Sequence, residues 1–228
     1  DNLNNALLRS REFLVHARVA IITLGTAWTY TLKASGETVG NCHKLPAAMF
    51  ERKMITVETA VTEIKKIVRS LQSLNPAVKV VFTISPIRHT ADGLHCNQLS
   101  KATLLIAVNR VCEEINETCS YFPAYEILLD DLRDYRFYAA DMKHPSEVAV
   151  NYIYNIFSES YFSKQTQETA REARKLSARL EHRNLSDNNE AMKSFIADTI
   201  DTAHSLSRKY PELTETIQSL ITHKFHQS

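Results

Sequence analysis

The chain has 228 residues, of which 44% are hydrophobic and 23% are charged, as in globular proteins that bury a core. Its 27 basic residues nearly balance its 26 acidic ones, so bulk charge attracts it neither to nucleic acid nor to an anionic membrane. No apolar run approaches the ~18 residues that a membrane span requires. No signal peptide is visible at the start of the sequence, and we expect a cytoplasmic protein.

The first half of the chain contains two apolar runs that predict buried strands. Apolar residues recur at helical spacing over residues 3–17 and 56–74, which predicts two helices. A β-branched run over residues 19–24 stops at Gly25, and a second run over residues 78–84 stops before Pro86. Residues 25–55 form a long loop in this interpretation, and loops of that length are usually functional or disordered.

The elements that follow continue the alternation of strand and helix. We expect a third helix over residues 99–118, a short apolar stretch at Tyr121 and Phe122, and a helix-like segment over 125–132. A fourth helix covers 145–162, with Pro145 suited to its first turn. Neither strand alternates apolar with polar residues, so we predict an α/β fold with a parallel sheet covered by helices on both faces.

The composition changes after Ser163. Two polar amphipathic helices are expected near residues 165–183 and 188–209, with a shorter one after Pro211. We therefore divide the chain into an α/β domain over 1–163 and a helical extension over 164–228. The extension is packed on the domain, used for self-association, or a solvated tail with one buried stripe. Self-association would predict a homo-oligomer through the C-terminal helices.

The sequence Asp141-Met142-Lys143-His144-Pro145 is the sharpest chemical motif in the chain. A carboxylate three residues before a histidine, in a turn that enters a helix, can accept a hydrogen bond from the imidazole. That bond fixes the tautomer and stabilises the imidazolium when the other nitrogen takes a proton from a nucleophile. The alternative is a helix N-terminal cap with an incidental histidine.

Polar residues and a glycine follow the two predicted strands. Gly25 and Thr26 come directly after the first strand, where a glycine lets a backbone N–H approach a substrate oxygen. Ser85, Arg88 and His89 follow the second strand and bring a hydroxyl, a guanidinium and an imidazole to the same sheet edge. Arg88 is a candidate for orienting an anionic or carbonyl-bearing substrate, or else a structural ion-pair partner.

Four cysteines are present, and none lies in a C-x-x-C pair, which excludes a zinc ribbon or a thioredoxin motif. We expect free thiols, since a chain of this size does not depend on disulfides. A zinc or thiol site would use Cys42, His43, His95 and Cys96, although this spacing matches no standard zinc pattern. Asn41, in the same loop as Cys42, could donate its amide to an oxyanion.

Five segments together resemble the GSCFA domain family, and they occur in family order between Ala17 and Phe162. They are IITLGTAWTY, GNCHKLP, TISPIRH, NQLSKATL and YFPAYEILLDDLRDYRFYAADMKHPSEVAVNYI. The family is named for a Gly-Ser-Cys-Phe-Ala block near its N-terminus and resembles the SGNH/GDSL hydrolases. The resemblance implies a three-layer, flavodoxin-like fold, an early serine nucleophile and a late D-x-x-H that supplies the acid and base partner.

Transferred residue by residue, the resemblance makes Asp141 and His144 the late D-x-x-H. Gly25-Thr26 resembles the glycine block of SGNH enzymes, usually Gly-x-Asn-Asp, but Ala27 and Trp28 replace the asparagine and aspartate. The amide of the oxyanion hole is therefore not where the wider superfamily places it, and Asn41 is the candidate replacement. Arg88 and His89 match a family motif without an assigned role.

No Gly-Ser-Cys-Phe-Ala block occurs in these residues, and neither Ser85 nor Ser146 lies in a Gly-x-Ser-x-Gly elbow. We expect the C-terminal part of the family's domain, inactive alone, which supplies Asp141 and His144 to the hydrolysis or transfer of an acyl group. The substrate implied is a small-molecule or carbohydrate ester, acetyl above all, and no cofactor or metal is expected. The alternatives are a binding module on the same scaffold and a metal- or thiol-dependent enzyme.

Overall fold

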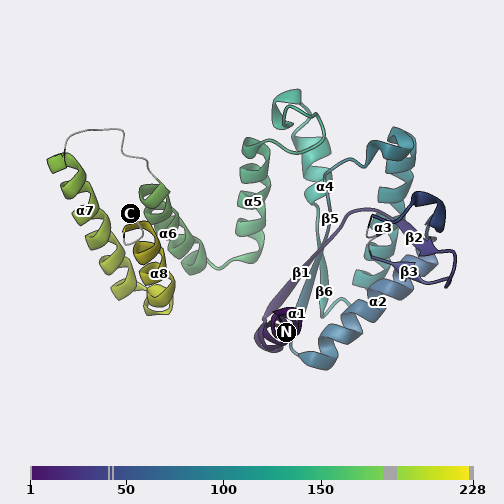
Figure 1. Cartoon of the computed structure of the whole chain (residues 1–228), viewed down its shortest axis with the longest axis horizontal. Helices are drawn as coiled ribbons and strands as arrows, with labels where there is room; N and C mark the ends of the chain where they lie inside the picture. The colour runs from purple at the N-terminus through teal and green to yellow at the C-terminus, as the bar shows by residue number, and fades with distance from the viewer. Residues whose placement is uncertain (1, 41, 43, 182–188, 226–228) are drawn as a thin grey trace. The chain divides into compact units, whose positions relative to one another are not determined.

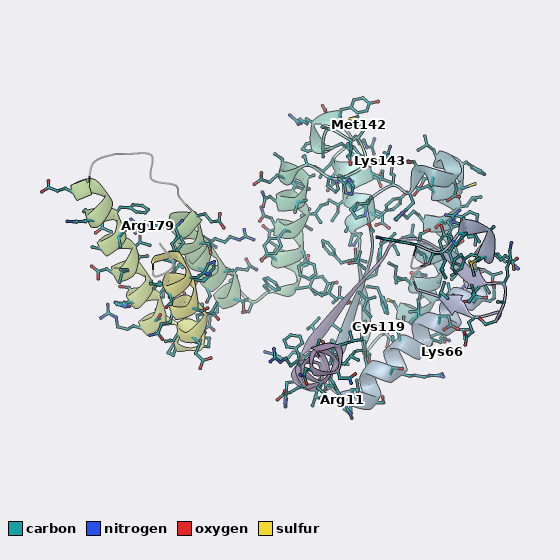
Figure 2. All side chains as sticks on the ribbon, viewed as in Figure 1. Arg11, Lys66, Cys119, Met142, Lys143 and Arg179 are labelled. Atoms are coloured by element: carbon teal, nitrogen blue, oxygen red, sulfur yellow. The ribbon has the colours of Figure 1, made fainter. Side chains whose placement is uncertain are left out.

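A computed structural model describes residues 2–40, 42, 44–181 and 189–225 of the chain (Figures 1 and 2). The fold divides into two compact units, Asp1–Tyr154 and Asn155–Ser228. The first unit is a mixed α/β structure, and the second is built from helices. Asn41 and His43, two of the candidate site residues, lie outside the described residues.

A parallel sheet forms the centre of the first unit and confirms the predicted α/β class. Its strands are β1 (Val19–Leu24), β5 (Lys79–Ile84) and β6 (Cys119–Phe122), in the order β1-β5-β6. Residue for residue, β1 pairs with β5 from Val19↔Lys79 to Leu24↔Ile84, and β5 pairs with β6 from Val80↔Cys119. Because all three strands run the same way, their carboxyl ends meet at one edge of the sheet.

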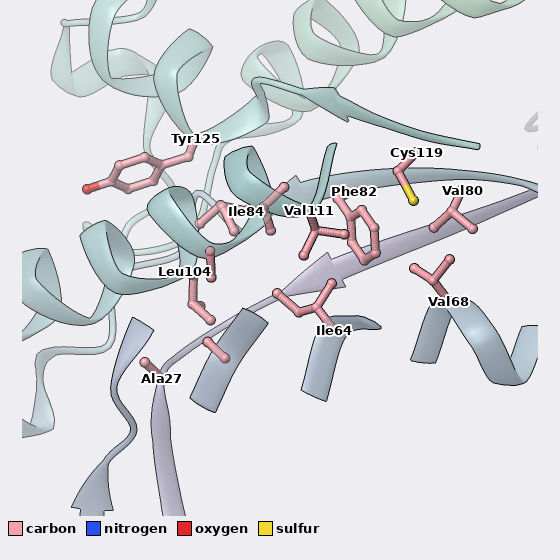
Figure 3. Close-up of a cluster of buried hydrophobic side chains, with 13 residues drawn as sticks. Ala27, Ile64, Val68, Val80, Phe82, Ile84, Leu104, Val111, Cys119 and Tyr125 are labelled. Atoms are coloured by element: carbon pink, nitrogen blue, oxygen red, sulfur yellow. The ribbon is translucent and has the colours of Figure 1, made fainter. Parts of the chain in front are cut away.

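Two long helices, α2 (Val57–Leu74) and α3 (Gly93–Glu114), cover one face of this sheet. Figure 3 shows the core that they form with the central strand, where the side chain of Phe82 is fully buried. The apolar residues of both helices recur at helical spacing, so each helix presents one apolar stripe to the strands. The buried residues are Ala27, Ala60, Ile64, Val68, Val80, Phe82, Ile84, Leu104, Ala107, Val108, Val111, Cys119 and Tyr125.

The first strand is less buried than its apolar sequence predicts. Val19 is 48% exposed and Ile21 57%, whereas Ala20, Ile22 and Leu24 on the other face are half-buried. In the described part of the chain β1 pairs with β5 alone, so it is an edge strand. The described helices leave the face of β1 that carries Val19 and Ile21 exposed, while the layered α/β class is as predicted. Helix α1 (Asn2–His16), which precedes it, also keeps most of its apolar side chains exposed.

Part of the predicted long loop folds into a second, antiparallel sheet. Its strands are β2 (Trp28–Leu32), β3 (Thr38–Val39) and β4 (Phe50–Met54), in the order β3-β2-β4. The sequence of β2 alternates threonine with large apolar residues, which is a strand pattern. The Arg52 guanidinium lies 4.3 Å from the centroid of the Trp28 ring and forms an ion pair with Asp92 beside α3.

The segment after β6 carries the predicted D-x-x-H motif. Helix α4 (Ala124–Glu126) continues into a π-helix over Ile127–Asp131, and α5 (Glu147–Tyr161) follows after a series of turns. Leu128, Leu132 and Ala149 form a small core between these pieces. Pro145 lies before α5 and forms an isolated bridge with Tyr138, so it is not in the first turn of the helix.

The second unit contains the three helices that the sequence predicts. They are α6 (Lys164–Glu181), α7 (Asn189–Lys209) and α8 (Thr214–Phe225). Arg179, labelled in Figure 2, donates from α6 to the Thr202 hydroxyl of α7 at 2.6 Å. The buried apolar residues are Leu176, Leu180, Ala203, Leu206, Tyr210 and Ile217. Among the helices described, none combines the length and apolarity that a bilayer crossing requires.

All four cysteines are free thiols, and the pKa values of two of them are raised. Burial, together with the neighbouring Cys119 thiol, raises the pKa of Cys112 to about 11, and burial also raises the pKa of Cys119. Because the thiolate is the nucleophile, we expect Cys112 to react about 100-fold more slowly with Ellman's reagent at about pH 8 in folded than in urea-unfolded protein. Peptide mapping of the labelled cysteines measures this ratio, and equal rates in both states would contradict the packing around β6.

Candidate functional site

The carboxyl ends of β1 and β5 bring together the residues that follow each strand. Ser85 donates its backbone N–H to the Leu24 carbonyl at 2.9 Å, which extends the ladder by one bond beyond the strands. Gly25 and Thr26 therefore lie beside the segment that carries Ser85, Arg88 and His89. This edge is the place where ligands bind in open α/β sheets.

The side chain of Lys101, on α3, forms hydrogen bonds with both of these segments. Its side chain is buried, with 1% of the residue exposed, and its Nζ donates to the carbonyls of Gly25 at 2.6 Å and Ser85 at 2.7 Å. In the described chain no carboxylate pairs with this amino group. Burial therefore lowers the pKa of Lys101 to about 8, because the charged form loses its hydration.

Three neighbours of Lys101 on α3 hold the same loops. The Ser100 hydroxyl accepts from the Ala27 backbone N–H at 2.7 Å and lies 3.0 Å from the Thr26 hydroxyl. The side-chain oxygen of Asn97 accepts a hydrogen bond from the His89 backbone N–H at 2.9 Å. Gln98 accepts from the Tyr125 hydroxyl, in the segment after β6. One turn and a half of α3 thus holds the segments that follow all three parallel strands.

The sequence interpretation did not assign these α3 residues to the site, although a signal was present. Asn97, Ser100 and Lys101 precede Leu104 and Val108 at the i, i+3, i+4, i+7 spacing of a buried helix face. Polar residues at core-facing positions need partners inside the protein, because an unpaired buried polar group is costly. The run therefore indicates fixed polar contacts at that end of the helix.

Gly25 and His89 are in close contact at this edge. A Cβ atom at Gly25 would lie 3.4 Å from Nε2 of His89, so the imidazole ring packs directly against the glycine. Burial, and then the charge of Lys101, lower the pKa of His89, so its ring is neutral near pH 7. Within the described chain, the backbone N–H groups of Gly25 and Thr26 have no acceptor. The segment after β1 thus brings together the backbone N–H donors of Gly25 and Thr26 and the neutral imidazole of His89.

The Asp141–His144 motif forms the hydrogen bond that the sequence predicts. Nδ1 of His144 lies 2.5 Å from Oδ2 of Asp141, while Oδ1 accepts from the backbone N–H groups of Lys143 and His144 at 2.9 and 3.0 Å. These bonds, the backbone bond from His144 first, hold the pKa of Asp141 well below its usual range. Met142, labelled in Figure 2, makes the tight turn with a φ of +60°.

Both side chains of this pair are accessible, with 58% of His144 and 47% of Asp141 exposed. With Nδ1–H donating to the carboxylate, Nε2 of His144 is the nitrogen that can accept a proton. Within the described chain, no serine hydroxyl hydrogen-bonds to this ring. The Ser85 hydroxyl accepts from the Ile87 backbone N–H at 3.3 Å, and that of Ser146 accepts from Ala149 at 3.4 Å.

Arg88 connects the segment after β5 to the turn that carries His144. Its guanidinium donates to the Tyr138 hydroxyl at 3.0 Å and lies 5.2 Å from the centroid of that ring. Tyr138 bridges to Pro145, and the next residue, Ala139, donates its N–H to the His144 carbonyl at 2.8 Å. Arg88 thus tethers a tyrosine and, among the described residues, forms no ion pair with a carboxylate. Its role in orienting a substrate stays a prediction.

The candidate zinc or thiol site is only partly described. Cys42 lies in the loop before the short helix at Ala47–Met49, whereas His95 and Cys96 lie in the first turn of α3. Within the described ranges, no group of three or more His, Cys, Asp or Glu side chains is placed to hold a metal ion. His43 and the proposed oxyanion donor Asn41 fall outside those ranges.

The burial of Lys101 makes folding stability depend on pH in a defined direction. The folded protein releases the Lys101 proton near pH 8, whereas an unfolded lysine keeps it until about pH 10.5. Between these values the unfolded state binds more protons, so the free energy of unfolding rises with pH, by about 2 to 3 kcal/mol from this group. The variant Lys101→Met lacks this contribution.

We therefore expect the stability of the wild type relative to Lys101→Met to increase over this pH range. Urea unfolding of both proteins at several pH values measures the difference, and the ionisation of tyrosines and cysteines cancels because both proteins share it. A stability difference that stays constant with pH would show that Lys101 is not a buried amine in the folded protein.

Comparison with known proteins gives one match. No curated protein and no solved structure matches the chain. The sequence model of the GSCFA family matches residues 1–157, which is more than half of the 228 residues and includes all three parallel strands and the Asp141–His144 turn. The match confirms the resemblance noted in the sequence, and the chain belongs to the GSCFA family.

Proposed function

We propose that this chain forms the acid–base and oxyanion part of an SGNH-type serine hydrolase that acts on an acyl ester, acetyl above all. The observation that carries the proposal is the hydrogen bond between the Asp141 carboxylate and Nδ1 of an accessible His144. A family related to SGNH and GDSL hydrolases supports the same reaction class. The substrate proposed is a small molecule or a carbohydrate that carries the ester.

The nucleophile in this proposal is a serine that lies outside these 228 residues. Its hydroxyl attacks the ester carbonyl, and Nε2 of His144 accepts the hydroxyl proton as the C–O bond forms. Asp141 stabilises the resulting imidazolium and keeps the ring in place. His144 then gives the proton to the departing alcohol. Water, or a second alcohol in a transfer reaction, attacks the acyl-serine by the same route in reverse.

The tetrahedral intermediate carries a negative charge on the former carbonyl oxygen. The backbone N–H groups of Gly25 and Thr26 are suited to this oxygen, because Lys101 holds the peptide unit that carries the Thr26 N–H and Ser100 holds the peptide unit that follows it. Donors that are held in place before the reaction stabilise developing charge without reorganisation. The tether from Arg88 to Tyr138 supports a fixed relation between this corner and the His144 turn.

A binding module without catalysis is the second candidate. It is favoured by the fully buried Ala27, whose backbone N–H is bonded to Ser100, and by the described serine hydroxyls, none of which bonds to His144. In such a module the Asp141–His144 pair would serve only to shape the turn.

Hydrolysis of p-nitrophenyl acetate separates the two candidates. We expect no turnover by the 228-residue chain, and turnover by a polypeptide extended upstream to include the family's serine block. In the longer protein His144→Ala should lower kcat by about 10⁴-fold or more, because a triad loses most of its effect with its base. His16→Ala, at an exposed histidine that ends α1, is the matched control and should leave kcat unchanged.

Each other outcome has a defined meaning for the proposal. Turnover by the short chain would point to a nucleophile within it. Turnover by the longer protein that survives His144→Ala would remove the proposed base. No turnover of acetyl esters by either protein would favour the binding module.

A further inference from the structure

His89 is an exposed histidine that the mechanism above leaves without a role. Its Nε2 lies next to Gly25, 3.4 Å from the position of a Cβ atom there. Among the described residues, neither ring nitrogen of His89 has a hydrogen-bond partner. A solvent-accessible polar ring that lies against a glycine at the ligand-binding edge of the sheet is therefore available to a ligand.

The surroundings of His89 disfavour the imidazolium form. Lys101 contributes a nearby positive charge, and burial removes hydration, so both effects lower the pKa of His89. In the described chain no carboxylate contacts the ring, in contrast to His144, whose Nδ1 is bonded to Asp141. A base must carry the positive charge during the reaction, so His89 is poorly suited to that role. A neutral imidazole can still donate one N–H and polarise a carbonyl.

The other side chains near Gly25 have their donors engaged. The Thr26 hydroxyl lies 3.0 Å from the Ser100 hydroxyl, which also accepts from the Ala27 backbone N–H. Lys101 directs its amino group to the carbonyls of Gly25 and Ser85. His89 is held by the bond from its own backbone N–H to Asn97, so its position is set by α3.

We propose that His89, as the neutral Nε2–H tautomer, is the side-chain donor of the oxyanion site beside the backbone N–H groups of Gly25 and Thr26. The inference deepens the proposed function and rests on it. The two imidazoles then have different roles. His144 transfers the proton, and His89 donates a hydrogen bond to the oxygen that gains negative charge. Three donors around one oxygen form a complete oxyanion site.

Acetate binding to the 228-residue chain tests this role without the serine. Acetate is the carboxylate product of the proposed reaction, and one of its oxygens can occupy the oxyanion position. We expect acetate, with sodium chloride as the salt control, to shift the amide resonances of Gly25 and Thr26 and the Nε2 resonance of His89. His89→Ala should weaken acetate binding about 10-fold or more, the effect of losing one hydrogen bond to a charged group.

Two variants control for folding and for general charge. His89→Gln keeps an amide donor and should bind acetate within about 3-fold of the wild type, because the hydrogen bond is retained. His16→Ala, at the end of α1, should bind acetate as the wild type does. Unchanged acetate affinity in His89→Ala, or acetate shifts that do not include Gly25 and Thr26, or no shifts at all, would each overturn the proposal.

Turnover by the upstream-extended protein separates this inference from the proposed function. In that protein His89→Ala should lower kcat by about 10²- to 10³-fold with little change in KM, as for other oxyanion donors. Full activity in His89→Ala would reject the role of His89 and leave ester hydrolysis standing. Acetate binding that depends on His89, without any ester turnover, would reject the hydrolase and leave the anion site standing.

Discussion

The arrangement of the site depends on one buried amino group, the Nζ of Lys101, which donates to the carbonyls of Gly25 and Ser85. These carbonyls lie just beyond the last ladder bond between β1 and β5, where the two strands are no longer paired. Asn97, Gln98 and Ser100 extend the same function, so that one helix fixes the segments after all three parallel strands. A rigid element thereby positions loops that would otherwise be mobile.

Long periodic segments could be predicted from the sequence because packing and local preference agree there. Helix α2, strand β5 and the three C-terminal helices follow their apolar spacing. The exposed face of β1 could not be predicted, since an apolar run does not reveal which faces of a strand are covered by helices. The sheet β3-β2-β4 was missed because its short strands pair only within a segment interpreted as a loop.

The candidate site was predictable in its parts but not in its connections. The Asp141–His144 hydrogen bond follows from a three-residue spacing, and the proximity of Gly25 to Ser85 follows from parallel strands. The bond from Arg88 to Tyr138 spans 50 residues and depends on tertiary packing that no local pattern encodes. The contrast between His144, which is bonded to a carboxylate, and His89, which lies near the charge of Lys101, likewise emerges only from the fold.

Hydrogen-bond scalar couplings from the Lys101 side chain test the central claim most directly. At about pH 6, below the pKa of this group, the amino group is charged and its protons can be observed if they are held in hydrogen bonds. The structure predicts couplings from the Lys101 nitrogen to the carbonyl carbons of both Gly25 and Ser85, with slow exchange of the amino protons. Rapid exchange with water and no coupling to either carbonyl would contradict the proposed organisation of the site.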